Sequence, residues 1–311
     1  MKTLALDEIK QILNTLDPLP LIEQGFVEYS KGLVTVPPVG ELIMDKGEVH
    51  IKYGAVKGGD YYTIKIASGF YGNSALGLPP GNGLMLLFSQ KTGALVCVLH
   101  DEAYLTDIRT AAAGAIAAKY LAPKDVSAIG IIGTGIQARL QALYLKDITP
   151  CRDIIVWGRD RQKAALYKQD MEQHGFTVRV AETISDVMTE ANLIVTTTTA
   201  KYPLIKAADI RPGMHVTAVG SDTADKQEIE AEILAMADIL VADSIDQCRE
   251  RGEIFQALRE RKIESDKAIE LGHVIANKAG RTRDNQITLA DLTGVAVQDI
   301  KIAEAVYLAS G

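Results

Sequence analysis

The sequence contains few of the residues on which several protein classes depend. Its three cysteines, Cys97, Cys151 and Cys248, are far apart among 311 residues, and no two have the CxxC spacing of a zinc site. Three widely spaced cysteines, an odd number, also argue against a disulfide framework. We therefore expect no metal site, and we expect a protein of the reducing cytoplasm.

Long apolar runs and an excess of basic residues are also absent. No run approaches the roughly 18 apolar residues of a membrane span, and Asp7 and Glu8 fall where a signal peptide would need its apolar core. The formal net charge is -7, whereas nucleic-acid binding calls for a basic face. Because no G-x-S-x-G segment occurs, a serine hydrolase is disfavoured. These absences indicate a globular protein that binds neither nucleic acid nor membrane.

The length of the chain favours two domains. Residues 4–16 have the spacing of an amphipathic helix, which we expect Pro18 and Pro20 to end. Between residues 32 and 100, short β-rich runs alternate with Gly and Pro clusters and predict a meandering antiparallel sheet. The Ala-rich segment 108–121 predicts a helix.

From residue 126 onward the pattern changes to strands that alternate with helices. This alternation predicts right-handed βαβ units and therefore a Rossmann-type, doubly wound parallel sheet, so the fold class is α/β. Further helices are expected over 226–236 and 246–262. A final helix over about 297–308 leaves the alternating pattern, and we expect it to pack back on the first domain.

A glycine turn lies between the first strand of this pattern and the following helix. Residues 133–138 read GTGIQA, which has the form GxGxxA. Gly133 permits a tight turn, Gly135 lets the backbone approach a pyrophosphate, and Ala138 lets the helix lie close to the strand. The free N–H groups of the helix start then face the phosphates. Because the strand and helix context is present, the turn predicts a dinucleotide cofactor.

The residues after the second strand bear on the choice between NAD and NADP. An acid there binds the ribose 2′-OH of NAD, whereas an arginine accommodates the 2′-phosphate of NADP. Gly158 occupies about the position of the acid, and Arg159 follows it, which favours NADP. Asp160 keeps NAD open, since boundaries read from sequence shift by about 2 to 4 residues.

Five segments in order along the chain resemble the ornithine cyclodeaminase/mu-crystallin family. They are the lysine strand at 64–73, the LTDIRTAA stretch within 104–113, the GTGIQA turn at 133–138, the AVGSD segment at 218–222 and the GVAVQD segment at 294–299. The resemblance covers nearly the whole chain.

The resemblance implies a homodimer that acts on a small amino or imino acid. It implies a dinucleotide-binding domain over 121–289, and a split α+β domain for substrate binding and dimerisation over 1–120 and 290–311. Lys65 and Asp222 are the implied catalytic residues. The implied substrate contacts are Lys65, Arg109, Asp222 and Gly294. The expected cofactor contacts are Thr110, Gly133, Thr134, Gly135, Ile136, Gln137, Gly158, Arg159, Asp160, Thr197, Thr198, Val219 and Ser221.

One position departs from the family pattern. The family commonly has an arginine after the prolines of its early strand, where this chain has Val39. A contact to the substrate carboxylate is therefore missing or moved, which disfavours an ornithine-type substrate and favours the members that reduce small imino acids.

Taken without the resemblance, each implied residue also has an ordinary explanation. Lys65 could be an exposed strand lysine, and Asp222 could be a turn or helix-capping residue. We expect Arg109 to begin a helix, where a cation is poorly placed, and this misfit favours a functional role.

Three functions follow from these features. The leading hypothesis is an NAD(P)H-dependent imino-acid reductase or, in reverse, an amino-acid dehydrogenase. A cyclodeaminase that recycles bound NAD and a non-catalytic NADPH-binding protein are the alternatives.

Overall fold

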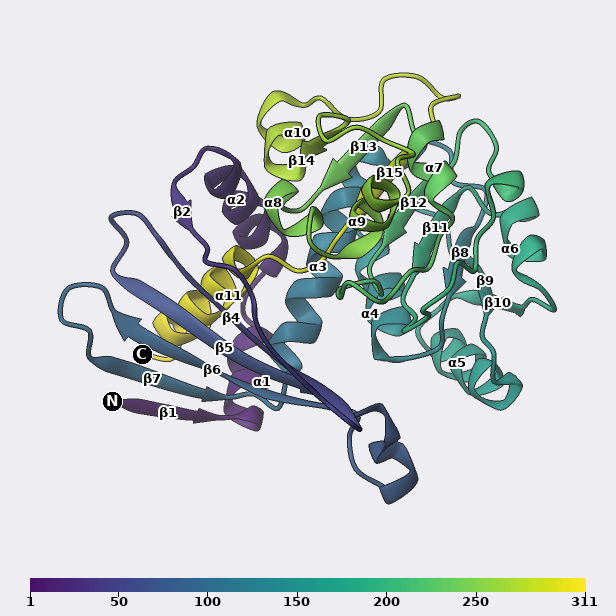
Figure 1. Cartoon of the computed structure of the whole chain (residues 1–311). Coiled ribbons are helices and arrows are strands. Elements are labelled where there is room, and N and C mark those ends of the chain that lie inside the picture. Colours follow the sequence, from purple (N-terminus) through teal and green to yellow (C-terminus); the bar gives the residue numbers. More distant parts are fainter. The chain divides into compact units, whose positions relative to one another are not determined.

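The computed structural model describes the backbone of the whole chain and the side chains of residues 1–73 and 75–311. The chain forms two compact units. The first consists of Met1–Arg109 together with Val295–Gly311, and the second consists of Thr110–Gly294 (Figure 1). Among the residues that the structure describes, no helix is both long enough and apolar enough to cross a membrane.

The first unit is built on a seven-stranded sheet. Its strand order is β1-β7-β6-β5-β4-β2, and β3 pairs with β4. The pairs from β2 to β7 are antiparallel, which confirms the expected meander, whereas β1 lies parallel to β7. The elements are β1 Lys2–Ala5, α1 Leu6–Leu13, α2 Pro18–Ser30, β2 Val34–Thr35, β3 Gly40–Met44, β4 Gly47–Val56, β5 Tyr61–Gly69, the 3-10 helix η1 Tyr71–Leu76, β6 Gly81–Ser89, β7 Leu95–His100 and α11 Ala296–Ala309.

The start of the chain differs from the single helix expected over 4–16. The first residues instead form β1, where Leu4 is buried beside β7, so strand pairing overrides the helical pattern. The prediction that Pro18 ends a helix is also wrong, because Pro18 begins α2. Asp17 caps this helix by accepting a hydrogen bond from the Leu19 N–H at 3.0 Å. Proline fits there because the first turn of a helix does not use its N–H groups.

Helix α11 joins residues that are far apart in the sequence. It packs on β4, β5 and β6 and also against α2 (Figure 1). The sheet face that it covers carries the buried side chains of Met85, Leu87 and Lys65. The first turn of α11 contributes Asp299.

The second unit is an eight-stranded sheet in which every neighbouring pair is parallel. The strand order is β10-β9-β8-β11-β12-β15-β13-β14. From β8 the chain first adds strands on one side and then, from β11 onward, on the other, as in a Rossmann-type fold. Its elements, with α3 Tyr104–Leu121 leading in, are β8 Ile129–Ile132, α4 Ile136–Leu145, β9 Asp153–Trp157, α5 Arg161–Gln173, β10 Thr177–Val180, α6 Ile184–Glu190, β11 Leu193–Thr196, η2 Ala207–Asp209, β12 His215–Ala218, α7 Ala231–Met236, β13 Ile239–Ala242, α8 Ile245–Cys248, α9 Gly252–Arg259, β14 Ala268–Glu270, α10 Leu271–Asn277 and β15 Thr288–Asp291.

Two of the expected helices are shorter than their patterns suggested. The helix expected over 226–236 begins only at Ala231, because Ile229 forms a bridge with Ile205. The helix expected over 246–262 is divided into α8 and α9. Gly252 has φ +87, a left-handed conformation that interrupts a right-handed helix.

Candidate functional site

A buried cluster of charged side chains lies in the first unit. The Lys65 Nζ is 3.1 Å from the Asp299 Oδ2, and the Arg109 Nε is 3.0 Å from the Asp299 Oδ1. The Arg109 Nη1 also donates to the Gln298 Oε1 at 3.1 Å. The side chains of Lys65, Arg109 and Asp299 are 3%, 6% and 1% exposed. The interpretation of Lys65 as an exposed strand lysine is therefore wrong.

The environment of Lys65 lowers its pKa to about 7. The largest cause is burial, and the nearby cations Arg109 and Lys52 lower the pKa further, while Asp299 opposes them. Lys52 lies directly opposite Lys65 across β4 and β5 and is also buried. A buried ammonium that titrates near neutrality is a frequent feature of ligand sites.

Arg109 reaches this cluster from within α3 rather than from its start. The helix begins at Tyr104, where the Asp101 carboxylate accepts a hydrogen bond from the Leu105 N–H at 2.8 Å. The misfit with the helix dipole that we inferred for Arg109 is therefore wrong. The burial and ion pairing of Arg109 now support a functional role instead.

The glycine turn of the second unit has two glycines that are required for different reasons. Gly133 has φ +126, and a Cβ there would lie 2.4 Å from the Thr197 Oγ1. Gly135 has the ordinary φ of -82, and, its chain neighbours aside, no atom of the described residues lies within 4 Å of where its Cβ would be. Neither conformation nor protein packing explains a glycine at position 135. The open space in front of it fits a pyrophosphate that approaches the backbone.

The residues that follow Gly135 begin α4, whose N-terminus has no side-chain cap. Ile136 is 56% exposed there although it is apolar. Gln137 accepts a hydrogen bond from Gln141, whose amide also donates to the carbonyl of Thr110. Arg139 donates to the carbonyls of Thr134 and Gly135 and so supports the turn. A helix N-terminus without a side-chain cap is suited to an anionic ligand.

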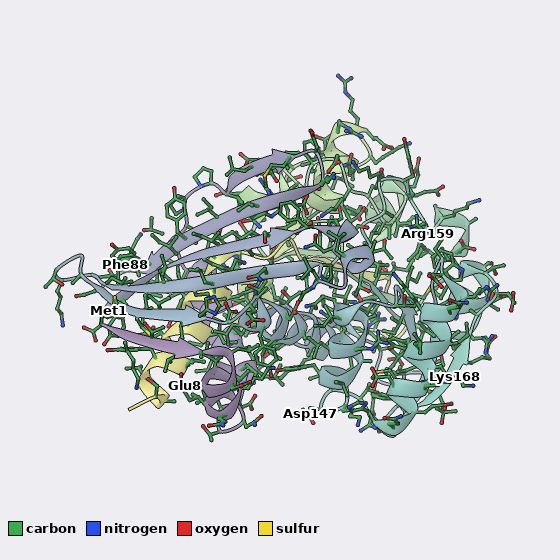
Figure 2. The ribbon with its side chains drawn as sticks, turned by 90° about the horizontal axis from the view of Figure 1, so that it is seen from below. Met1, Glu8, Phe88, Asp147, Arg159 and Lys168 are labelled. Carbon is green, nitrogen blue, oxygen red and sulfur yellow. The ribbon has the colours of Figure 1, made fainter. Side chains whose placement is uncertain are left out.

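The end of β9 has a glycine where an acid was expected. A Cβ on Gly158 would lie 2.5 Å from the Thr134 Cγ2, so a larger residue would require the Thr134 side chain to move. Asp160 caps α5 by accepting hydrogen bonds from the N–H groups of Gln162 and Lys163. Arg159 is exposed (Figure 2). Of the two charged residues that could contact the adenosine ribose, Asp160 therefore already serves as a helix cap.

A buried carboxylate ties together the ends of two central strands. Glu228 accepts hydrogen bonds from the Thr196 hydroxyl at 2.6 Å, from the Thr198 N–H at 2.5 Å and from the Gly220 N–H at 2.8 Å. Burial raises the pKa of Glu228, which these hydrogen bonds oppose. Glu228 therefore shapes the carboxyl edge of β11 and β12, where the expected contacts Thr197, Thr198 and Val219 lie.

Asp222 lies in the loop that follows this edge. The Lys226 Nζ is 2.7 Å from its Oδ1, and the Asp222 side chain is 35% exposed. The Ser221 hydroxyl donates to the Lys226 carbonyl at 2.9 Å, so it supports the loop from within. Gly294 has φ +82, and its N–H donates to Asp243 at 2.6 Å.

The expected residues thus fall into two sets. Lys65 and Arg109 belong to the first unit, whereas Thr110, Asp222, Gly294 and the remaining cofactor candidates belong to the second. Sequence reasoning gave no role to Asp299, Gln298 or Glu228. The segment that contains Asp299 was part of the family pattern, but nothing in the sequence connects it with Lys65 and Arg109.

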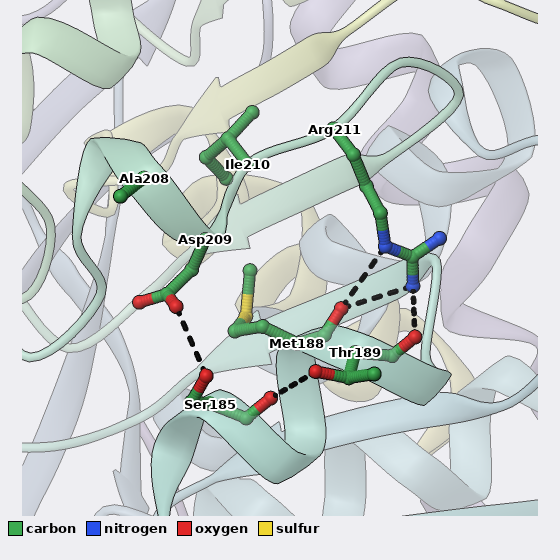
Figure 3. A pocket seen from close by; sticks show the side chains of 7 residues that line it. All are labelled: Ser185, Met188, Thr189, Ala208, Asp209, Ile210 and Arg211. Atoms are coloured by element: carbon green, nitrogen blue, oxygen red, sulfur yellow. Dashed lines mark hydrogen bonds between the residues drawn. The ribbon is translucent and has the colours of Figure 1, made fainter.

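Two surface hollows of the second unit lie away from these residues. One, of about 410 Å³, is lined by the seven residues drawn in Figure 3, and Arg211 there donates to the carbonyls of Met188, Thr189 and Ala191. Its lining segments lead into the amino ends of β11 and β12. The second hollow lies at the starts of β8, β9 and β10. Ligands of open α/β sheets bind at the opposite, carboxyl edge.

The parallel sheet with its glycine turn defines a Rossmann-type protein. The model of the ornithine cyclodeaminase/mu-crystallin family matches residues 2–309. The chain is 42% identical to an uncharacterized cyclodeaminase of Sinorhizobium fredii, over 99% of this chain and 95% of that protein. The chain therefore belongs to the ornithine cyclodeaminase/mu-crystallin family.

Two solved structures are similar over nearly their full length. An archaeal alanine dehydrogenase dimer with bound NAD has a TM-score of 0.91 and 32% identity, covering 99% of this chain and 95% of that chain. The Δ1-pyrroline-2-carboxylate reductase of Thermococcus litoralis, in complex with NADH and L-proline, has a TM-score of 0.93 and 26% identity, covering 100% and 97%.

Proposed function

We propose that this protein is an NAD(P)H-dependent oxidoreductase that interconverts a small imino acid and the corresponding amino acid. The observation that carries the proposal is the buried pair of cations, Lys65 and Arg109, in a chain that also has a dinucleotide-type glycine turn. Both similar solved structures contain a nicotinamide cofactor, and one of them contains an amino acid.

In this proposal Lys65 and Arg109 bind the substrate carboxylate. Arginine has five N–H donors. Gln298 accepts one from Arg109, and the Arg109 Nε forms an ion pair with Asp299. The remaining donors are available for a carboxylate, and the Lys65 ammonium adds a point charge. Fixing the carboxylate fixes the orientation of the neighbouring α-carbon.

The residues of the turn fit a dinucleotide. The backbone around Gly133 and Gly135 and the first N–H groups of α4 would hold the pyrophosphate, and Thr197, Thr198 and Val219 would border the nicotinamide end. When bound, the cofactor supplies the hydride that reduces the substrate. We assign to Asp222, whose Oδ1 lies 2.7 Å from the Lys226 Nζ, the stabilisation of the protonated substrate nitrogen.

We further propose a preference for NADP. Arg159 is exposed and follows the strand end directly, whereas Asp160 already caps α5. The solved relatives contain NAD and NADH, so the preference of this chain depends on Arg159. It is tested below.

A homodimer is part of the proposal, with the first unit as the substrate-binding and dimerisation domain; the archaeal relative is a dimer. The location in a reducing cytoplasm also stays a prediction, and the free state of Cys97, Cys151 and Cys248 is compatible with it.

The experiment combines purified protein with NADPH or NADH and a panel of cyclic imines and of α-keto acids with ammonia or methylamine. We expect the absorbance of the reduced nicotinamide to fall with at least one small imino acid, and the amino acid to drive the reverse reaction. If no member of the panel changes the absorbance, the oxidoreductase proposal is wrong.

A cyclodeaminase is the second candidate, favoured by the relative in Sinorhizobium fredii. It predicts release of ammonia from ornithine or lysine without net consumption of cofactor. Val39, in place of the arginine that the family commonly has, argues against it.

A further inference from the structure

Asp299 occupies the centre of the buried cluster in the first unit. Each of its two carboxylate oxygens faces a different cation, with Oδ2 at 3.1 Å from the Lys65 Nζ and Oδ1 at 3.0 Å from the Arg109 Nε. We propose that Asp299 is a positioning residue, whose carboxylate holds the Lys65 ammonium and the Arg109 guanidinium side by side as the receptor for one substrate carboxylate. This inference rests on the proposed function.

The three side chains come from three separate elements. Lys65 projects from β5, Arg109 from the second turn of α3 and Asp299 from the first turn of α11. Two buried cations repel one another and lose their hydration, so a carboxylate between them is needed to keep them adjacent. While Lys65 is protonated, Lys65, Arg109 and Asp299 together carry one net positive charge, which matches a single carboxylate.

The charged groups around Lys65 set its protonation. Arg109 on α3 and Lys52 on β4 lower the pKa of Lys65, Asp299 on α11 raises it, and Asp101 lies close enough to interact with the ammonium. On the β6 side, the residue paired with Lys65 is the apolar Met85. Removing the charge of Asp299 therefore lowers the pKa of Lys65 from its value of about 7.

The test uses Asp299→Asn, Asp299→Glu and, as a matched control, Glu304→Gln. The control removes one negative charge from the same helix α11, away from the cluster. The pH dependence of KM for the imino acid is measured for each variant, together with the KM for NADPH. The pKa of Lys65 is followed by NMR in protein labelled with [13C]lysine, with the Lys65 resonance assigned from Lys65→Arg.

For Asp299→Asn we expect KM for the imino acid to rise about tenfold or more at pH 7.5, in line with the loss of one charge-assisted contact. The KM for NADPH should stay unchanged. The pH at which KM for the imino acid begins to rise should be lower than in the wild type. Lowering the pH of the assay should restore substrate binding. Asp299→Glu keeps the charge, so it should retain the wild-type pH profile while raising KM, and Glu304→Gln should resemble the wild type.

An unchanged pKa of Lys65 in Asp299→Asn would overturn the inference. A loss of kcat in Asp299→Asn, with the pH dependence of KM unchanged from the wild type, would also overturn the inference. If Asp299→Asn does not fold, Asp299→Glu decides: an unchanged KM contradicts the inference, and a raised KM with the wild-type profile supports it. Because the NMR titration does not depend on turnover, a lowered Lys65 pKa without any reductase activity would refute the proposed function and leave the role of Asp299 intact.

Discussion

Lys65 is charged below its pKa of about 7 and neutral above it. Since a carboxylate binds the ammonium and not the neutral amine, substrate affinity in the free enzyme should fall as the pH rises through 7. We expect KM for the imino acid to increase from pH 6.5 to pH 8.5, while the KM for NADPH changes little. Steady-state kinetics over this range measure both.

Replacing Lys65 provides a second measurement at the same residue. For Lys65→Ala we expect KM for the imino acid to rise about 10- to 100-fold, which corresponds to one charge-assisted hydrogen bond. Lys91→Ala is the matched control, because the Lys91 side chain is 77% exposed and pairs only with Asp60 on the surface. Equal effects of the two variants would contradict a role for Lys65 in the site.

Arg159 should determine the choice of cofactor. Arg159→Ala removes the cation that we expect to contact the 2′-phosphate, so the KM for NADPH should increase about 10- to 100-fold. The KM for NADH should stay within about twofold of the wild type, because NADH lacks that phosphate. Arg283→Ala, another exposed arginine of the same unit, is the control. If both coenzymes respond equally to Arg159→Ala, the NADP preference is wrong.

For single residues, the sequence predicts the chemistry of a side chain better than it predicts the contacts of that side chain. Lys65 and Arg109 were proposed from the family resemblance, and the structure shows them on the same carboxylate. Asp299 had no predicted role, because its partnership depends on how α11 packs on the sheet. Similarly, the cap that Asp160 provides for α5 follows from local backbone geometry that a motif does not specify.

Among the elements, the turn between β8 and α4 permits a comparison of two similar substitutions. Gly133→Ala places a Cβ 2.4 Å from the Thr197 Oγ1 at φ +126, so we expect it to destabilise the fold by about 1 to 3 kcal/mol. Gly135→Ala makes no close contact with the described residues beyond its chain neighbours, so its melting temperature should be unchanged. Its NADPH affinity should nevertheless fall about tenfold or more, because the Cβ occupies the space of the pyrophosphate.

Thermal melts and fluorescence titration with NADPH measure the two effects separately. An NADPH affinity of Gly135→Ala equal to that of the wild type would show that the open space is not a cofactor site.

The repeating strand–helix elements were predictable because their periodicity is local. The parallel sheet appears as expected, with β8 immediately before the glycine turn. The pattern could not reveal β1, whose four residues are held by pairing with β7, 95 positions further along. It also missed the role of Pro18, since a proline is compatible with both the end and the first turn of a helix.

In the molecule as a whole, His215 makes stability depend on pH. It lies in the central strand β12, between the hydroxyls of Thr288 and Thr217 at 2.9 and 2.8 Å, and burial lowers its pKa to about 3. The unfolded chain, with an ordinary histidine pKa, binds one more proton than the folded protein below pH 6.5. Acidification from pH 6.5 should therefore remove about 1.4 kcal/mol of this residue's stabilising contribution per pH unit.

Urea unfolding at pH 5.0, 6.0 and 7.0 tests this expectation. His215→Val should be less stable than the wild type at pH 7, but its stability should decline less on acidification. The exposed His174 provides the control variant His174→Gln, which should retain the wild-type slope. A wild-type slope in His215→Val would show that another group is responsible.

The closure of the first unit by α11 also has a consequence for folding. Residues 110–294 are contiguous, whereas the sheet of the first unit needs α11, which follows them in the chain. A chain truncated after residue 294 can therefore complete the second unit while the first unit lacks its covering helix. The apolar face formed by Met85 and Leu87 then remains open to solvent or to chaperones. We expect a released chain truncated after residue 294 to resist protease within residues 110–294 and to be cleaved within residues 1–109.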